Sequence, residues 1–139
     1  MSSLALRIIS STFLVIVLQY NLQAQNQDWI LLAKKDVSYK ADKDVLTLIG
    51  NERKVEKIKL KCTQGSLKIK KTTLIYSATD HEEHKPKGTG ILTKGTSSIP
   101  YKIAQDKNLK QIEIEYEAYG NTLLTKRAKV EVLGLKHKK

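Results

Sequence analysis

The most constraining feature of this chain is a two-residue alternation of apolar and polar side chains that runs from Val55 to Tyr76. Side chains alternate between the two faces of a strand, so the pattern predicts two half-buried β-strands. Gln64-Gly65 interrupts the alternation, and a glycine supplies the positive φ that a two-residue turn needs. We therefore expect a β-hairpin. Its apolar side would consist of Ile58, Leu60, Cys62, Leu67 and Ile69.

The register of this hairpin follows from its turn. With Gln64 and Gly65 as the turn, Cys62 would face Leu67 and Leu60 would face Ile69. That pairing places every apolar side chain of both strands on one face, which is the condition that fixes a strand register. We expect that face to pack on the core of the protein.

Further short strands are expected on both sides of this segment, and apolar residues nowhere recur at helical spacing over a convincing length. The expected strands cover residues 28–35, 45–49, 91–92, 98–103, 111–119 and 125–133. About eight short strands spaced by roughly 8–12 residues predict an all-β domain. The expected architecture is an antiparallel β-sandwich, with a barrel-like closure as the alternative.

Several details of these strands are also predicted. In the first strand, Trp29 and Leu31 are expected to share a face with Ala33, and Trp29 and Tyr116 are assigned to the core, whereas Tyr119 points outward. Pro100 has no amide hydrogen for a ladder, so its strand should lie at a sheet edge or be bulged. The strands 111–119 and 125–133 are expected to form a second hairpin, which would place the outward glutamates of the first beside Arg127 and Lys129.

The chain divides into three segments. Residues 1–24 have the layout of a signal peptide: Arg7 is followed by an apolar block at residues 13–18 and by the small residue Ala24. The block is shorter than the roughly 20 residues that span a membrane, so no transmembrane segment is expected. Residues 25–135 are expected to form a single β-sandwich domain, and the basic tail 136–139 is expected to be disordered.

The charge of the chain comes mainly from lysine. The formal net charge is +11, and Arg53 and Arg127 are the only arginines after the leader. Specific phosphate and base recognition favours the arginine fork and stacked aromatic side chains, so no specific nucleic acid is expected as a partner. Cys62 is the single cysteine, which rules out an intramolecular disulfide, and its alternation position assigns it to the core.

The outward lysines of the central segment form the candidate binding surface for a polyanion. In the expected hairpin, Lys61 would face Lys68 and Lys59 would face Lys70, and like charges that face each other across strands cost stability. We favour relief of this repulsion by glutamates of a neighbouring strand, and the alternative is a basic patch for an anionic partner. The lysines concerned are Lys57, Lys59, Lys61, Lys68 and Lys70.

Two clusters of chemically active residue types are assigned to the surface. His81-Glu82-Glu83-His84 lies in a segment without apolar residues, 79–90, which we expect to be an exposed loop. Its spacing differs from H-E-x-x-H and lysines follow it, so no metal or cofactor site is predicted. Glu113, Glu115 and Glu117 have a spacing compatible with acid–base catalysis, but we assign them to a solvated face and predict no catalytic residue.

Several segments in sequence order resemble a known family. They are Trp29-x-Leu31-Leu32, Val55-x-Lys57-Ile58-x-Leu60, Gly65-x-Leu67-x-Ile69, Ile91-x-x-Lys94-Gly95-x-Ser97 and Ala128-x-Val130-x-Val132-x-Gly134. In order and spacing the chain is similar to the uncharacterised family of small exported bacterial proteins that includes the periplasmic protein YaaI. Some members also resemble one another in a cysteine pair, which this chain lacks. The resemblance implies an exported all-β domain and supplies no activity or catalytic residue.

Together these observations favour an exported, non-catalytic β-sandwich protein, periplasmic or extracellular, that acts as a binding or envelope-associated module. Its partner would be an anionic envelope polymer or another protein. Weak polyanion binding through the lysine-rich face is one alternative, and a hydrolase that uses Glu113, Glu115 and Glu117 is another.

The leader yields a direct prediction. Because no charge occurs from Ile8 to Gln27 and Ala24 ends the apolar stretch, the mature protein should begin at or near Gln25. Intact-mass measurement of protein recovered outside the cytoplasm should show the loss of about 24 residues. A mass that retains Met1 would contradict this prediction.

Overall fold

The computed structural model describes residues 28–40, 42–48, 54–120 and 127–137. This part of the chain contains nine strands and no helix, and therefore no helix that is long and apolar enough to cross a membrane. The strands are β1 Trp29–Ser38, β2 Lys43–Thr47, β3 Lys57–Gln64, β4 Ser66–Ile75, β5 His81–His84, β6 Ile91–Thr93, β7 Tyr101–Lys102, β8 Gln111–Ala118 and β9 Arg127–Leu135.

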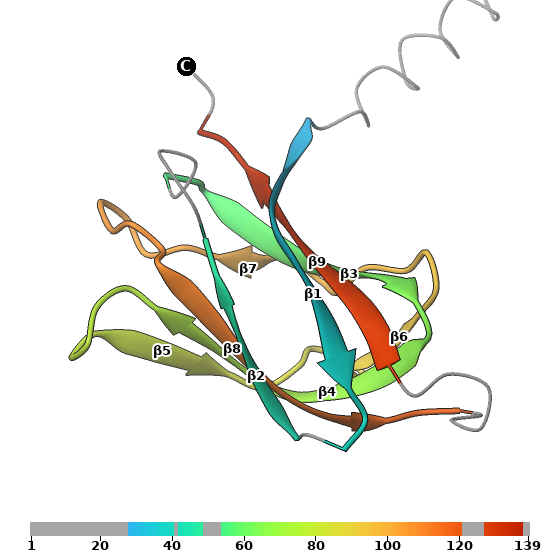
Figure 1. Cartoon of the computed structure of the whole chain (residues 1–139). Coiled ribbons are helices and arrows are strands. Elements are labelled where there is room, and N and C mark those ends of the chain that lie inside the picture. The colour runs from blue at the N-terminus through green and yellow to red at the C-terminus, as the bar shows by residue number, and fades with distance from the viewer. Residues whose placement is uncertain (1–27, 41, 49–53, 121–126, 138–139) are drawn as a thin grey trace, which may run out of the picture.

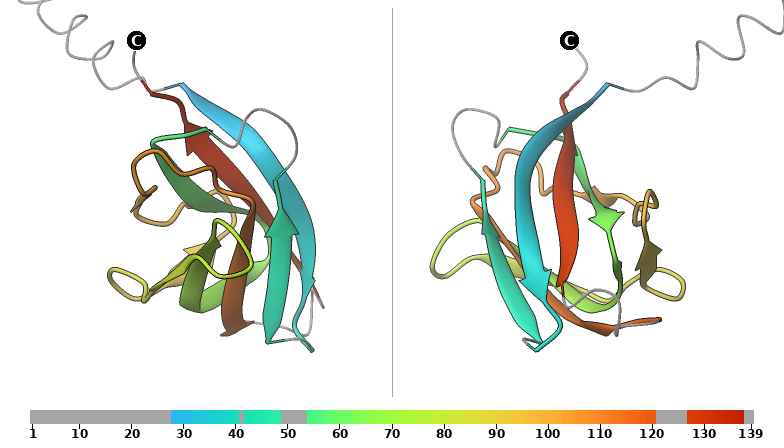
Figure 2. Two further views of the ribbon diagram at one scale, coloured as in Figure 1. Left: turned by 90° about the vertical axis from the view of Figure 1, so that its left-hand side faces the viewer. Right: turned by 45° about the vertical axis from the view of Figure 1, so that its right-hand side comes forward.

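The strands form two antiparallel sheets that pack face to face (Figures 1 and 2). Sheet A has the order β1-β9-β3-β7, and sheet B has the order β2-β8-β4-β5, with β6 also paired to β4. The predicted antiparallel sandwich is thus confirmed, and the described strands do not close into a barrel. The predicted leader, residues 1–24, and the end of the predicted tail, residues 138–139, lie outside the described residues.

The expected hairpin between β3 and β4 is wrong. β3 pairs with β9 and β7 in sheet A, whereas β4 pairs with β8, β5 and β6 in sheet B. The chain therefore crosses from one sheet to the other at Gly65. The alternation correctly indicated which side chains are buried, but both inner faces of a sandwich are apolar. Cys62 and Leu67 consequently line opposite layers of the core and are not cross-strand partners.

Gly65 is required at this crossing by its conformation and by its surroundings. Its φ is 73°, in the left-handed region that favours glycine. A Cβ atom there would lie 2.7 Å from the Tyr39 hydroxyl oxygen and 3.0 Å from the Arg127 carbonyl oxygen. The Tyr39 hydroxyl also donates to the carbonyl of Ser66, at 2.8 Å, and accepts from its amide, at 3.1 Å. One half-buried tyrosine hydroxyl thus satisfies the amide and the carbonyl of Ser66, where the chain changes sheets.

The core lies between the sheets and consists of the inward residues of both. Its fully buried members include Val37, Leu46, Ile58, Leu60, Cys62, Leu67, Ile69, Leu74, Ile112, Ile114, Tyr116, Val130 and Val132. The burial predicted for Cys62 is therefore confirmed, and burial raises the pKa of its thiol above the ordinary value. Tyr119 is 43% exposed, as the alternation predicted.

The second expected hairpin is also wrong. β8 lies between β2 and β4 in sheet B, whereas β9 lies between β1 and β3 in sheet A. The glutamates of β8 and the residues Arg127 and Lys129 of β9 are therefore on different sheets. Residues 121–126, which connect these strands, lie outside the described residues.

Tyr116 links the two sheets at the edge where β1 and β2 approach each other. Its hydroxyl oxygen lies 2.9 Å from the Ser38 carbonyl oxygen and 2.7 Å from Asp44 Oδ2, and the two acceptors share its one proton. Burial and the hydrogen bond to Asp44 raise the pKa of Tyr116 well above its usual value. Lys35 of β1 adds an ion pair to Asp44 at 3.1 Å and donates to the Val45 carbonyl at 3.0 Å. These contacts fix the relative position of the sheets along this edge.

The structure corrects the expectation for residues 79–90. His81–His84 forms the edge strand β5 and pairs antiparallel with residues 72–75 of β4. An edge strand needs no apolar side, and charged residues on it oppose pairing with other chains, so the absence of an apolar pattern did not exclude a strand.

The second strand begins two residues earlier than expected, at Lys43. Pro100 immediately precedes β7, which lies at the edge of sheet A, as its lack of an amide hydrogen predicted.

Candidate functional site

The outer face of sheet A is strongly basic. Ile58, Leu60 and Cys62 of β3 point into the core, so the lysines between them point outward. We call this outer face the basic face. Its charged residues are Lys34, Asp36, Lys57, Lys59, Lys61, Lys102, Arg127, Lys129 and Glu131, as the strand registers place them. Seven cations and two anions give this face a formal charge of 7 − 2 = +5.

Positive charge on the basic face is concentrated along β3. Lys57 lies opposite Lys102 of β7 on one side and opposite Leu135 of β9 on the other. Lys59 lies opposite Leu133, and only Lys61 lies opposite an acidic residue, Glu131. No ion pair within 4.0 Å connects these lysines to a carboxylate among the described residues. Their ammonium groups are therefore available to an anion from solution.

An apolar row adjoins these lysines. It contains Trp29 and Leu31 of β1, which lie opposite Leu135 and Leu133 of β9, and Leu31 is 44% exposed. The Lys59 ammonium nitrogen lies 4.3 Å from the centre of the Trp29 ring, a cation–π contact. The basic face thus combines apolar and cationic groups in adjacent rows.

The core assignment of Trp29 is wrong, and Ala33 does not share the outer face on which Trp29 and Leu31 lie. A β-bulge between Leu31 and Ala33 shifts the pairing of β1 with β9. As a result Leu32 is buried, Leu31 is exposed and Trp29 is only half-buried. The alternation of β9 itself, with Val130 and Val132 inward, already placed Leu133 and Leu135 outward, and this is the signal by which sequence reasoning could have found the apolar row.

The outer face of sheet B has a different charge balance. We call it the mixed face, and its charged residues are Lys43, Lys68, Lys71, Glu83, Glu113, Glu115 and Glu117. Three cations and four anions give a formal charge of 3 − 4 = −1. The two outer faces of the sandwich therefore differ by six charges.

Two of the three lysines of the mixed face form ion pairs with its glutamates. Lys68 lies 3.9 Å from Glu117, and Lys71 lies 3.3 Å from Glu83 and 3.8 Å from Glu115. The interpretation that glutamates of a neighbouring strand offset the positive charge of the outward lysines is thus confirmed for Lys68. Such exposed pairs contribute only about 0–1 kcal/mol each.

The structure divides the five lysines that formed the predicted polyanion surface. Lys57, Lys59 and Lys61 lie on the basic face, Lys68 lies on the mixed face, and Lys70 is exposed at a bulge of β4 between Ile69 and Lys71. The facing pairs Lys61–Lys68 and Lys59–Lys70 do not exist because their strands belong to different sheets.

The other candidate residues lie on sheet B. Of the predicted glutamate row, Glu115 and Glu117 are engaged in the ion pairs just described, and Glu113 lies further along the same strand face. His81 and His84 point to opposite sides of β5, and His84 Nε2 lies 3.3 Å from Glu82. Among the described residues, no group of three or more His, Cys, Asp or Glu side chains is arranged to hold a metal.

Comparison with known proteins identifies the family. A family model described as "Domain of unknown function (DUF2541)" matches residues 9–134. The chain belongs to this family. No curated protein and no solved structure matches the chain.

The contact between Lys59 and Trp29 can be tested by fluorescence, because Trp29 is the only tryptophan. Replacement Lys59→Met keeps an unbranched side chain and removes the ammonium group. It should change the intensity of tryptophan emission and lower stability by about 0.5–1 kcal/mol. Lys61→Met, on the same face of β3, is the control and should leave the emission unchanged. Equal spectra for the wild type and both variants would contradict the contact.

Proposed function

We propose that this protein is an exported, non-catalytic module that binds an anionic polymer of the cell envelope through the basic face. The observation that carries this proposal is the difference in charge between the outer faces, +5 on sheet A and −1 on sheet B. A protein that needed positive charge only for solubility would have no reason to gather it on one sheet. An asymmetric charge distribution steers and orients an oppositely charged partner.

The geometry of the basic face suits a polymer. Lys57, Lys59 and Lys61 lie on one side of one strand, so their Cα atoms are spaced by about 7 Å. Regularly spaced ammonium groups match a chain that carries repeated carboxylate, phosphate or sulfate groups. Lysines act as hydrated point charges with little geometric preference. Binding is therefore expected to be weak at each contact, additive over several contacts and sensitive to salt.

Export rests on the sequence of the leader and on the resemblance to exported bacterial proteins of the family that includes YaaI. A location in the periplasm or outside the cell would bring the basic face into contact with anionic envelope polymers. The non-catalytic role is supported by the ion pairs that engage Glu115 and Glu117 on the mixed face. The hydrolase hypothesis for Glu113, Glu115 and Glu117 is therefore ranked lower.

A second candidate is peripheral binding to an anionic lipid surface. It is favoured by the apolar row of Trp29, Leu31, Leu133 and Leu135 beside the lysines. Tryptophan and lysine are both common where proteins contact the membrane interface. Sedimentation with vesicles distinguishes the candidates, because Leu31→Ser should weaken binding to phosphatidylglycerol vesicles and leave binding to a soluble polyanion unchanged.

The proposed function predicts that position, and not net charge alone, determines polyanion affinity. The triple variant Lys57→Gln, Lys61→Gln and Lys102→Gln removes three charges from the basic face and leaves the Lys59–Trp29 contact intact. At about 0.5 kcal/mol for each contact, its affinity for heparin should fall about tenfold. Elution from a heparin column and titration at several salt concentrations measure this loss.

The matched control removes the same number of charges from sheet B, by Lys43→Gln, Lys68→Gln and Lys70→Gln. Its affinity for heparin should remain within about twofold of the wild type, because these lysines lie away from the basic face. Thermal melts establish that both variants fold. An equal loss in the two variants would show that only net charge matters and would contradict the proposal.

A further inference from the structure

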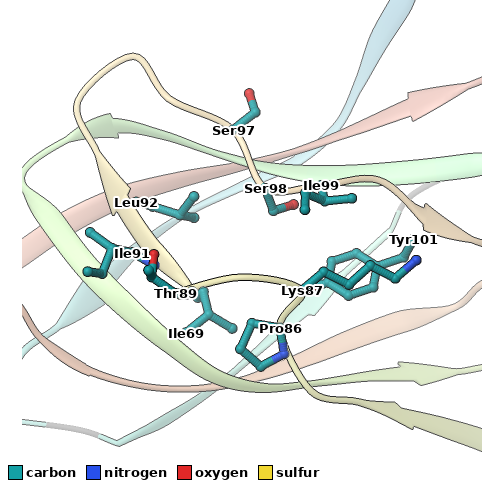
Figure 3. A pocket seen from close by; sticks show the side chains of 11 residues that line it. Ile69, Pro86, Lys87, Thr89, Ile91, Leu92, Ser97, Ser98, Ile99 and Tyr101 are labelled. Carbon is teal, nitrogen blue, oxygen red and sulfur yellow. The ribbon is translucent and has the colours of Figure 1, made fainter.

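A pocket opens between the two sheets at the edge of β4 (Figure 3). β4 pairs with β6 through residues 66–68 and with β5 through residues 72–75. Between these stretches the segment 86–90 passes along β4, and the Ile69 amide donates to the Gly90 carbonyl at 2.8 Å. The opposite wall is the segment 97–101, which runs along β3 of sheet A. The pocket encloses about 110 Å³.

The walls of this pocket are held in place by specific contacts. A Cβ atom at Gly90 would lie 2.3 Å from the Ile69 carbonyl oxygen and 3.1 Å from Pro86, so only glycine permits this close approach. Ser98 exchanges two hydrogen bonds with Leu60: its amide donates to the Leu60 carbonyl at 2.7 Å, and its hydroxyl accepts from the Leu60 amide at 2.9 Å. The pocket is therefore largely preformed, which lowers the entropic cost of binding.

Tyr101 fixes the end of the pocket. Its hydroxyl is hydrogen-bonded to the Thr72 hydroxyl at 3.1 Å, in the buried interior. Its ring also makes an edge contact with His84, with the ring centres 5.6 Å apart. Both hydrogen-bonding and packing thus determine the orientation of the ring, and its apolar surface remains as a wall of the pocket.

The lining has an apolar and a cationic part. Its apolar side chains are Ile69, Pro86, Ile91, Leu92, Ile99 and Tyr101. Ile99 is 53% exposed at the rim, although it is a large aliphatic residue. Lys87 lines the same pocket, and Figure 3 shows its side chain extended at the end where Tyr101 lies. Lys87 has no ion pair among the described residues. An occupant should therefore carry an apolar body and one negative charge.

The volume limits the size of that body. An apolar cavity of about 150 Å³ holds benzene. A pocket of about 110 Å³ is smaller, so it suits a branched group of about four or five carbon atoms. Longer alkyl chains would extend beyond the rim into water.

We propose that this pocket binds a small carboxylate with a branched alkyl group, either a free acid or the C-terminal residue of a peptide. The alkyl group fills the space between Ile69, Leu92 and Tyr101, and the carboxylate pairs with the Lys87 ammonium group. This site lies between the sheets and is independent of the basic face. A result that contradicts polyanion binding therefore does not contradict ligand binding in the pocket, and the reverse also holds.

The experiment is a titration of the ¹⁵N-labelled full domain, followed by amide shifts, with 4-methylpentanoate as the probe. A ligand of this size should bind with a dissociation constant on the order of 1 mM. The shifts should be largest at Ile69, Gly90 and Leu92. Octanoate should bind no more tightly than 4-methylpentanoate, because the pocket is filled by the shorter chain. N-acetylleucine represents a peptide C-terminus. Tighter binding of 4-methylpentanoate identifies a free acid as the ligand, and tighter binding of N-acetylleucine identifies a peptide C-terminus.

Two variants test the roles of charge and shape. Lys87→Gln should weaken binding of 4-methylpentanoate about three- to fivefold and leave binding of its neutral amide unchanged, since the contact is solvent-exposed. Lys85→Gln, the matched control two residues away and outside the pocket, should have no effect. Ile99→Asp should weaken binding of both 4-methylpentanoate and its neutral amide. Because Ile99 is exposed, the variant should still fold. Absence of shifts at Ile69, Gly90 and Leu92, equal effects of the two lysine variants, or affinity that rises with chain length would overturn the proposal.

Discussion

The structure depends on the passage of the chain from one sheet to the other at Gly65. Two amphipathic strands follow each other almost without a break, and each must bury its apolar side. In a hairpin both strands would share one sheet, but here a left-handed glycine turns the chain so that β3 and β4 face each other across the core. The Tyr39 hydroxyl satisfies both polar groups of the Ser66 backbone at the crossing. A larger residue at position 65 would displace that hydroxyl.

The distribution of charge follows from this crossing. Because β3 and β4 lie in different sheets, their outward lysines emerge on opposite surfaces of the domain. The lysines of β3 adjoin β9 and the edge strand β7, which contribute Glu131 and the further cation Lys102. Those of β4 adjoin β8, and its glutamates pair with Lys68 and Lys71. The same alternating pattern thus produces an unneutralised cationic surface on one sheet and a neutralised surface on the other.

Much of the fold could be predicted from side-chain periodicity, because alternation reports directly on burial. Ile58, Leu60 and Leu67 are fully buried as predicted. Strand pairing could not be predicted, since two apolar inner faces allow more than one set of partners. The orientation of Trp29 could not be predicted, because the bulge between Leu31 and Ala33 has no signature in the residue pattern. The pocket was missed because its walls come from irregular segments around Gly90 and Ile99, which have no periodicity to read.

The pairing of β3 with β9, and not with β4, is tested most directly by nuclear Overhauser effects between backbone protons. The structure predicts cross-strand effects between Leu60 and Val132, and between Lys61 and Glu131, which are paired in sheet A. It predicts none between the backbones of Leu60 and Ile69, which belong to different sheets. A ladder of effects from Leu60 to Ile69 and from Cys62 to Leu67 would contradict the crossing at Gly65, and with it the separation of the basic face from the mixed face.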